Sequence, residues 1–190
     1  GQFPENTLMA FEDCVTSDDF NTDIFEFDLH ITKDGQLILL HDETLARTTN
    51  SAAVFGVTEA KPADYTFDEI RKLNFGEGFT DESGKTPYKG LSGDKIPENL
   101  RAVKLETALD YLQSHGNYCY IIEIKDSGEL GKKAADKLYA VLKDKDMLEK
   151  AVIGTFHGDV TKYMDETYPD MLRSCGIVEG IKFYFCAFFG

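Results

Sequence analysis

Apolar and acidic residues alternate strictly from Phe25 to Leu29, and this alternation predicts a β-strand. Phe25, Phe27 and Leu29 share one face of that strand. Glu26 and Asp28 share the opposite face. Two neighbouring acids are costly to bury unless a cation neutralises them. The pattern therefore predicts one face that packs in a core and a second face that holds a cation such as a metal ion.

The rest of the chain switches repeatedly between strand and helix periodicities. Strands are expected at about residues 24–30, 37–41, 118–125, 151–156 and 171–174. Helices are expected at about residues 8–15, 105–112, 130–141, 158–167 and 181–188. Asn6 is the expected cap of the first helix. Strands that alternate with helices are typical of an α/β protein whose parallel sheet is covered by helices.

The architecture that fits best is a (β/α)8 TIM barrel, in which functional groups lie where strands end and loops begin. We expect it to be incomplete, with the first strand and the last strands missing. The chain opens on loop-like sequence and closes on the aromatic run FYFCAFFG, which has no following partner. A doubly wound open sheet is the alternative, although the chain has no dinucleotide-type glycine motif.

Residues 1–190 are expected to form a single domain that is interrupted by an insertion at about 43–104. This stretch is polar and rich in Gly, Asp and Lys, and it is long for a connecting loop. Thr66 and Glu69 predict a capping box for one short helix that runs to Leu73. The remainder of the insertion predicts little regular structure.

Composition narrows the possible partners. The chain carries 34 Asp and Glu against 20 Lys and Arg, which gives a formal net charge of −14. Non-specific binding of nucleic acid is excluded because a phosphate backbone demands a basic surface. The sequence contains neither an apolar run of membrane-spanning length nor a signal peptide.

The four cysteines form no CxxC pair, which argues against a zinc knuckle. Cys119 lies in an apolar strand, and Cys186 lies in an aromatic segment. They are interpreted as buried free thiols, which favours a reducing compartment such as the cytoplasm.

A second strand repeats the acidic pattern of the first. In the run YIIEIK, Ile121, Glu123 and Lys125 share one face. In a barrel this strand lies near the first one, so Glu26, Asp28 and Glu123 would gather at one edge. Three carboxylates form an oxygen-rich site suited to Mg²⁺ or Ca²⁺. Lys125 would either hold an anion beside them or form a salt bridge to Glu123 or Glu26.

Histidines supply the candidate proton-transfer group. His41 ends a strand on the inward face beside the three acids, where an imidazole can give or take a proton near neutral pH. By parity Asp42 is expected to face the other way. His30 is expected to support the site or lie at the surface, and His157 is expected to be a loop residue. Arg47 either binds a phosphate or braces its loop.

Four motifs together resemble the glycerophosphodiester phosphodiesterase family. They are PENT at 4–7, FEFDLHITKDG at 25–35, HDETLARTT at 41–49 and IEIK at 122–125, in an order and spacing that agree across nearly the whole chain. The resemblance implies a TIM barrel and a divalent cation. It also implies hydrolysis of a small-molecule glycerophosphodiester to glycerol 3-phosphate and an alcohol, and it makes residues 43–104 the insertion characteristic of the family.

The resemblance also assigns roles to single residues. The family's metal ligands match three acids here, Glu26, Asp28 and Glu123. One of its two catalytic histidines matches His41, which would act as the acid. Its phosphate-contacting lysine matches Lys125, and Glu5 falls in a motif close to the site. The family has a His-Arg pair just before the PENT segment, and this chain starts after that pair.

Two other functions fit the same sequence. One is a phospholipase D-like lyase of the same superfamily, which would act on a lysophospholipid or sphingolipid and expose an apolar groove. The other is a catalytically impaired or truncated binding form that lacks the His-Arg pair. The second is less consistent with a chain that keeps all three expected metal ligands.

Overall fold

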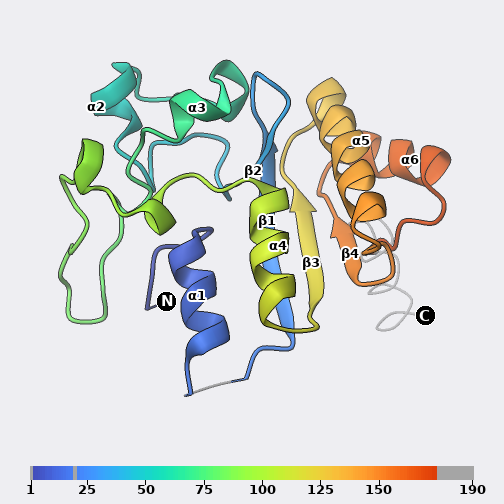
Figure 1. Ribbon diagram of the computed structural model, residues 1–190. Helices are drawn as coiled ribbons and strands as arrows, with labels where there is room; N and C mark the ends of the chain where they lie inside the picture. The colour runs from blue at the N-terminus through green and yellow to red at the C-terminus, as the bar shows by residue number, and fades with distance from the viewer. Residues whose placement is uncertain (1, 19–20, 175–190) are drawn as a thin grey trace, which may run out of the picture.

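The computed structural model describes residues 2–18 and 21–174 (Figure 1). A four-stranded sheet with the order β2-β1-β3-β4 forms its centre. The strands are β1 (Ile24–Ile31), β2 (Leu37–Leu39), β3 (Cys119–Ile124) and β4 (Ala151–Gly154). β1, β3 and β4 run parallel to one another, as the alternation of strands and helices predicts.

β2 departs from the expected parallel arrangement because it pairs antiparallel with β1. Leu39 lies opposite Leu29, and Leu37 lies opposite Ile31. Only residues 32–36 join the two strands, and a parallel neighbour needs a crossover of a dozen or more residues. The connection is a tight turn in which the Gly35 amide donates to the Thr32 carbonyl at 2.9 Å.

The predicted fifth strand at 171–174 is present only as one parallel bridge between Ile153 and Arg173. Two backbone hydrogen bonds of 2.9 Å flank it, from Ile153 to the Leu172 carbonyl and from Ser174 to the Ile153 carbonyl. The next expected element, the helix at 181–188, lies outside the described residues, as do Cys175 and Cys186.

Four helices pack on one face of the sheet. They are α1 (Leu8–Thr16), α4 (Leu105–His115), α5 (Gly128–Asp144) and α6 (Gly158–Thr167). Their buried apolar residues form one core with the odd-numbered side chains of β1 and the even-numbered ones of β3. Phe27 lies at its centre, with ring centroids 5.9 Å from Phe11 and 6.3 Å from Tyr120. The predicted parity of the first strand is therefore confirmed.

The first helix begins differently from the prediction. Thr7, not Asn6, is the N-cap, and its Oγ1 accepts a hydrogen bond from the Ala10 amide at 3.3 Å. Asn6 adopts a left-handed backbone with φ of 54°, a conformation that asparagine tolerates better than most residues. The Asn6 side chain is therefore free to reach toward the sheet.

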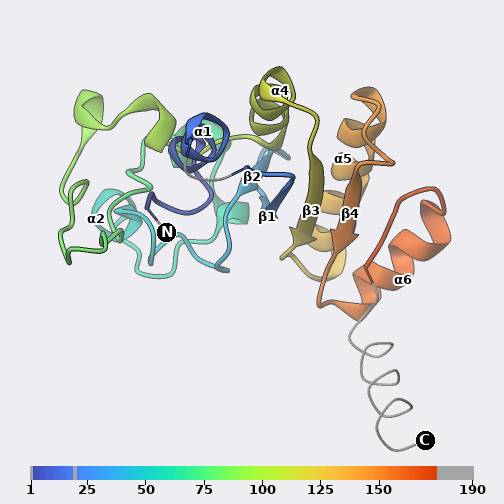
Figure 2. The ribbon, with the colours of Figure 1, turned by 90° about the horizontal axis from the view of Figure 1, so that it is seen from below.

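The segment 43–104 has its own small core. It contains α2 (Ser51–Phe55), α3 (Phe67–Ile70) and three 3-10 turns, η1 (Pro62–Asp64), η2 (Gly93–Lys95) and η3 (Glu98–Leu100). Its buried apolar residues pack together with Ile38 and Leu40 from the β2 region. Figures 1 and 2 agree that the segment extends beyond the β2 edge of the sheet, whereas α6 lies at the β4 edge.

The predicted capping box is confirmed. The Thr66 side chain accepts from the Glu69 amide, and the Glu69 carboxylate accepts from the Thr66 amide at 2.8 Å. The helix ends at Ile70 rather than Leu73.

The expectation of buried thiols is wrong for Cys119, which is exposed. Tyr120 points into the core, so the preceding residue of the strand points to the opposite face. Among the described residues, no helix has the length and apolar character needed to cross a bilayer.

Candidate active site

The parallel register of β1 and β3 brings acids from distant parts of the sequence together. Asp28 lies directly opposite Glu123, and Glu26 lies one step earlier on the same face of β1. This face points away from the four helices, because the alternate residues of both strands fill the helix-side core. Asp28 is nevertheless buried, and Glu123 is partly buried.

Lys125 bridges the two facing acids. Its Nζ lies 3.0 Å from Asp28 Oδ1 and 3.0 Å from Glu123 Oε2. Burial alone would lower the pKa of Lys125, but the hydrogen bonds to Glu123 and Asp28 outweigh it and raise the pKa above its usual value. Of the two alternatives for Lys125, the salt bridge is present, to Glu123 and Asp28 rather than to Glu26.

Glu26 completes the acidic group. Burial raises its pKa, and the negative charges of Asp28 and Glu123 raise it further. The three carboxylates therefore act on one another electrostatically, although Glu26 itself is exposed at the edge of the group.

The donor set fits a hard divalent cation. Three carboxylates face one ammonium group, which leaves a surplus of negative charge, and carboxylate oxygens are preferred ligands of Mg²⁺ and Ca²⁺. As the side chains stand, no three His, Cys, Asp or Glu residues in the described part of the chain enclose a cation site. The Lys125 ammonium lies between the two facing carboxylates instead.

His41 lies beyond the end of β2, which stops at Leu39 instead of continuing to His41. The expectation that Asp42 faces away is wrong, because strand parity no longer applies where the chain bends after Leu40. His41 Nδ1 lies 2.8 Å from Asp42 Oδ1. A carboxylate only accepts hydrogen bonds, so Nδ1 donates and Nε2 is left for proton exchange.

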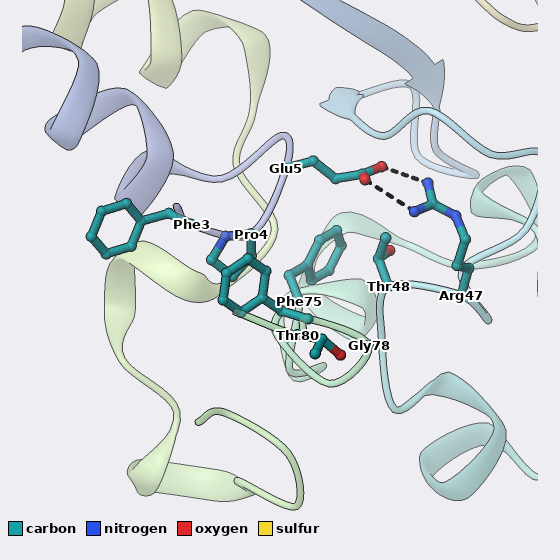
Figure 3. A pocket seen from close by; sticks show the side chains of 9 residues that line it. Phe3, Pro4, Glu5, Arg47, Thr48, Phe75, Gly78 and Thr80 are labelled. Atoms are coloured by element: carbon teal, nitrogen blue, oxygen red, sulfur yellow. Dashed lines mark hydrogen bonds and ion pairs between the residues drawn. The ribbon is translucent and has the colours of Figure 1, made fainter. Parts of the chain in front are cut away.

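Arg47 braces this histidine through two acids. Its Nε donates to Asp42 Oδ2 at 2.6 Å, and its two terminal nitrogens donate to Glu5 at 2.5 and 3.0 Å. Figure 3 shows this two-pronged contact between Glu5 and Arg47. Hydrogen bonds from Arg47 and His41 lower the pKa of Asp42 to about 2. Of the two roles open to Arg47, bracing is the one present.

The residues of the PENT motif, β1 and His41 line one hollow. Its volume is about 550 Å³, and its walls include Glu5, Asn6, Glu26, Asp28 and His41. Asn6 Nδ2 lies 3.4 Å from Asp28 Oδ2, a long contact that joins the N-terminal loop to the acids. The four candidate site residues Glu5, Glu26, Asp28 and His41 therefore border one space. Lys125 and Glu123 adjoin it through Asp28.

Several supporting residues were missed or misplaced by sequence reasoning. Asn6 was assigned to helix capping, and Asp42 was expected to face away. His30 is buried and hydrogen-bonded to Asp126, a residue that no motif singled out. His157 Nε2 lies 2.9 Å from the Lys125 carbonyl. A signal was available for Asp126, since an acid directly after a strand can reach the end of the neighbouring strand.

Parallel strands that alternate with helices on one face of the sheet, and that carry acids on the other face, are typical of the α/β barrel class. The model of the glycerophosphoryl diester phosphodiesterase family matches residues 1–180. The chain belongs to this family, as its four motifs predict.

Curated relatives agree with the family. A glycerophosphodiester phosphodiesterase of Caldanaerobacter subterraneus is 31% identical over 180 residues, which cover 93% of this chain and 64% of that protein. A glycerophosphodiester phosphodiesterase of Bacillus subtilis is 37% identical over 153 residues, which cover 79% of this chain and 45% of that protein. The chain thus spans about half to nearly two thirds of the length of these relatives.

Solved structures confirm the fold. An Oleispira antarctica phosphodiesterase, whose structure contains the product sn-glycerol-3-phosphate, aligns with a TM-score of 0.67 at 20% identity. The alignment covers 91% of this chain and 60% of that one. The described strands and helices are therefore part of a (β/α)8 barrel.

Proposed function

We propose that the protein hydrolyses a glycerophosphodiester to glycerol 3-phosphate and an alcohol with the help of a divalent cation, Mg²⁺ or Ca²⁺. The observation that carries the proposal is the convergence of Asp28, Glu123 and Glu26 on one face of two strands, with Lys125 between the first two. Family membership supports the phosphodiester as the substrate class.

Glu26, Asp28 and Glu123 would hold the cation through their carboxylate oxygens. A bound divalent cation polarises a phosphate oxygen and offsets charge that develops in the transition state. Lys125 makes its present contacts with two of these acids, so it would be available to a phosphate oxygen when they bind a cation instead. Glu5 would support the site through its contact with Arg47.

His41 would give a proton to the departing alcohol. In hydrolysis, water adds to phosphorus while the bond from phosphorus to the alcohol oxygen breaks, and that oxygen needs a proton as it leaves. Asp42 accepts from His41 Nδ1 and Arg47 fixes Asp42, so the ring is oriented with Nε2 available. Arg47 therefore acts as a positioning residue for the proton donor.

The test measures release of glycerol 3-phosphate from glycerophosphocholine by the intact protein. Turnover should require Mg²⁺ or Ca²⁺ and stop in EDTA. Asp28→Asn should lower kcat/KM by about 100-fold or more, because one anionic ligand is lost at unchanged size. His41→Ala should lower kcat by about 100-fold and leave KM near its original value.

Glu129→Gln is the matched control, because this exposed acid pairs only with Lys132 on the surface of α5 in the described structure. It should leave turnover unchanged. Full activity in EDTA, or in Asp28→Asn, would overturn the cation role. Unchanged turnover in His41→Ala would show that another group protonates the alcohol.

A lyase that acts on a lysophospholipid is a second candidate, favoured by one observation. A pocket of about 340 Å³ lies between the N-terminal loop and the 43–104 segment (Figure 3). Phe3, Pro4, Phe75 and Phe79 line it together with Glu5, which also borders the 550 Å³ hollow. In the lyase reaction a glycerol hydroxyl of lysophosphatidylcholine attacks phosphorus and choline leaves. Formation of the cyclic lipid phosphate together with free choline, with glycerophosphocholine left intact, would favour this candidate over the hydrolase.

A further inference from the structure

The pocket of about 340 Å³ between the N-terminal loop and the 43–104 segment has two unlike walls. Aromatic rings and a proline form one wall, contributed by Phe3, Pro4, Phe75 and Phe79. The Glu5–Arg47 ion pair belongs to the other wall (Figure 3). An occupant of this pocket therefore meets apolar rings and fixed charges at the same time.

The charged wall never carries a net positive charge. Arg47 is shared between two acids, because it donates to both oxygens of Glu5 and also to Asp42. Asp42 contacts His41 in turn. This cluster has a charge of −1 when His41 is neutral and of zero when His41 is protonated. Since the whole chain has a formal net charge of −14, the wall accepts a cation and disfavours an anion.

The aromatic wall supplies a second means of recognising a cation. Phe75 is only 2% exposed, and Phe79 is half-buried against Tyr88 with ring centroids 5.8 Å apart. These contacts hold the two rings in place. The face of an aromatic ring carries partial negative charge and attracts a quaternary ammonium group, whose methyl groups also pack on the ring. This wall therefore suits a cation with an apolar surface.

Other groups match only one of the two walls. An acyl chain would pack on the rings, but it would take the Glu5–Arg47 pair out of water without giving either charge a new partner. A carboxylate would face Glu5, and a primary ammonium is compact and strongly hydrated, so it is costly to place among apolar rings. A trimethylammonium group combines a positive charge with an apolar surface.

We propose that this pocket recognises the quaternary ammonium of a choline-type alcohol in the diester, an inference that rests on the proposed function and narrows its substrate class. Arg47 lines the pocket and fixes Asp42, which orients His41, the proposed proton donor to the alcohol. Glu5 borders both this pocket and the 550 Å³ hollow beside Asp28. An alcohol that His41 protonates thus places its far end beside Glu5 and the rings.

The test compares glycerophosphocholine with its neutral isostere, the glycerol 3-phosphate ester of 3,3-dimethylbutanol. A carbon replaces the nitrogen in the second diester, so the shape is kept and only the positive charge is lost. With Mg²⁺, the wild-type protein should release glycerol 3-phosphate from glycerophosphocholine with a kcat/KM about fivefold higher. That ratio corresponds to about 1 kcal/mol of cation–π attraction.

Variants of Phe79 test the aromatic wall. Phe79→Leu removes the ring but keeps an apolar side chain, so the preference should fall to about twofold or less while turnover of the neutral diester persists. Phe79→Tyr keeps a ring face and should keep the preference. Phe55→Leu is the matched control, because Phe55 is a half-buried ring of the same segment that stacks on Tyr65 at 4.0 Å and does not line the pocket. It should leave rate and preference unchanged.

A binding measurement separates this inference from the proposed function. In calorimetry, choline chloride should bind about fivefold more tightly than 3,3-dimethylbutanol, and Phe79→Leu should remove the difference. Equal kcat/KM for the two diesters, faster hydrolysis of the neutral one, or an unchanged preference in Phe79→Leu would refute the inference alone. Hydrolysis of neither diester, in a protein that prefers choline through Phe79, would refute the proposed function alone.

Discussion

Replacing Lys125 by methionine would leave two facing carboxylates without their cation. The Asp28 and Glu123 side chains are only 8% and 18% exposed, and each lies 3.0 Å from the Lys125 ammonium. Removal of one partner from a buried ion pair costs about 3–5 kcal/mol, and partial exposure places this case near 3 kcal/mol. For a chain of this length, that loss lowers Tm by about 6–12 °C.

Lys137→Met provides the matched control. Lys137 Nζ also lies 3.0 Å from a carboxylate oxygen, that of Glu106, but its side chain is 36% exposed. An ion pair on the surface contributes about 0.5 kcal/mol, so this variant should melt close to the wild type. Urea unfolding in EDTA, followed by circular dichroism, compares both variants with the wild-type protein.

Mg²⁺ should then rescue Lys125→Met selectively. At 100 times its dissociation constant, a ligand that binds only the folded state adds about 2.7 kcal/mol. The variant should gain more from Mg²⁺ than the wild type, because no ammonium competes for the two carboxylates. Equal urea midpoints for the two lysine variants in EDTA, or equal Mg²⁺ shifts for variant and wild type, would refute this reasoning.

Three further predictions concern the surroundings of the site. The pKa of Asp42 is about 2 in the folded protein, below the roughly 3.9 of an unfolded chain. Ionised Asp42 therefore adds about 1 kcal/mol, after solvent screening, to the free energy of unfolding. This contribution is complete above about pH 4 and is lost as the pH falls to about 2. In Arg47→Gln the urea midpoint should therefore change less between about pH 4 and pH 2 than in the wild-type protein. An unchanged pH dependence in that range would contradict the coupling between Asp42 ionisation and stability. Phe27→Ala, which empties the aromatic centre of the main core, should cost about 3–5 kcal/mol in urea unfolding, and a loss below about 1 kcal/mol would argue against that packing. Gly78→Ala would place a methyl group against the Arg47 carbonyl oxygen and should cost about 2 kcal/mol in urea unfolding, whereas Gly158→Ala, in open space, should be neutral in the same assay.

Local patterns predicted the parts of the fold that depend on local physics. The alternation from Phe25 to Leu29 follows directly from strand geometry, and the structure has both faces as predicted. The capping box at Thr66 is equally local, since it needs only residues three positions apart.

Features that depend on pairing between distant segments were less accessible. The sequence predicted that Glu123 would lie near Asp28, but the direct register of the two residues is a property of the assembled sheet. His41 was expected to end a strand, whereas β2 ends at Leu39 because the chain bends away from β1, which itself continues in the sheet back to Ile24. Asp126 was overlooked since its partner, His30, is 96 positions away.

The separate core of the 43–104 segment divides the candidate site between two cooperative units. Arg47 belongs to that segment, whereas Asp28 and Glu123 belong to the sheet with its larger core. Units with less buried apolar surface open at lower free energy than the rest of a domain. Amide hydrogens in α3 should therefore exchange faster than those in β3. Partial opening would release the brace on His41 while the acidic residues stay in register, so chemistry would fail before cation binding does.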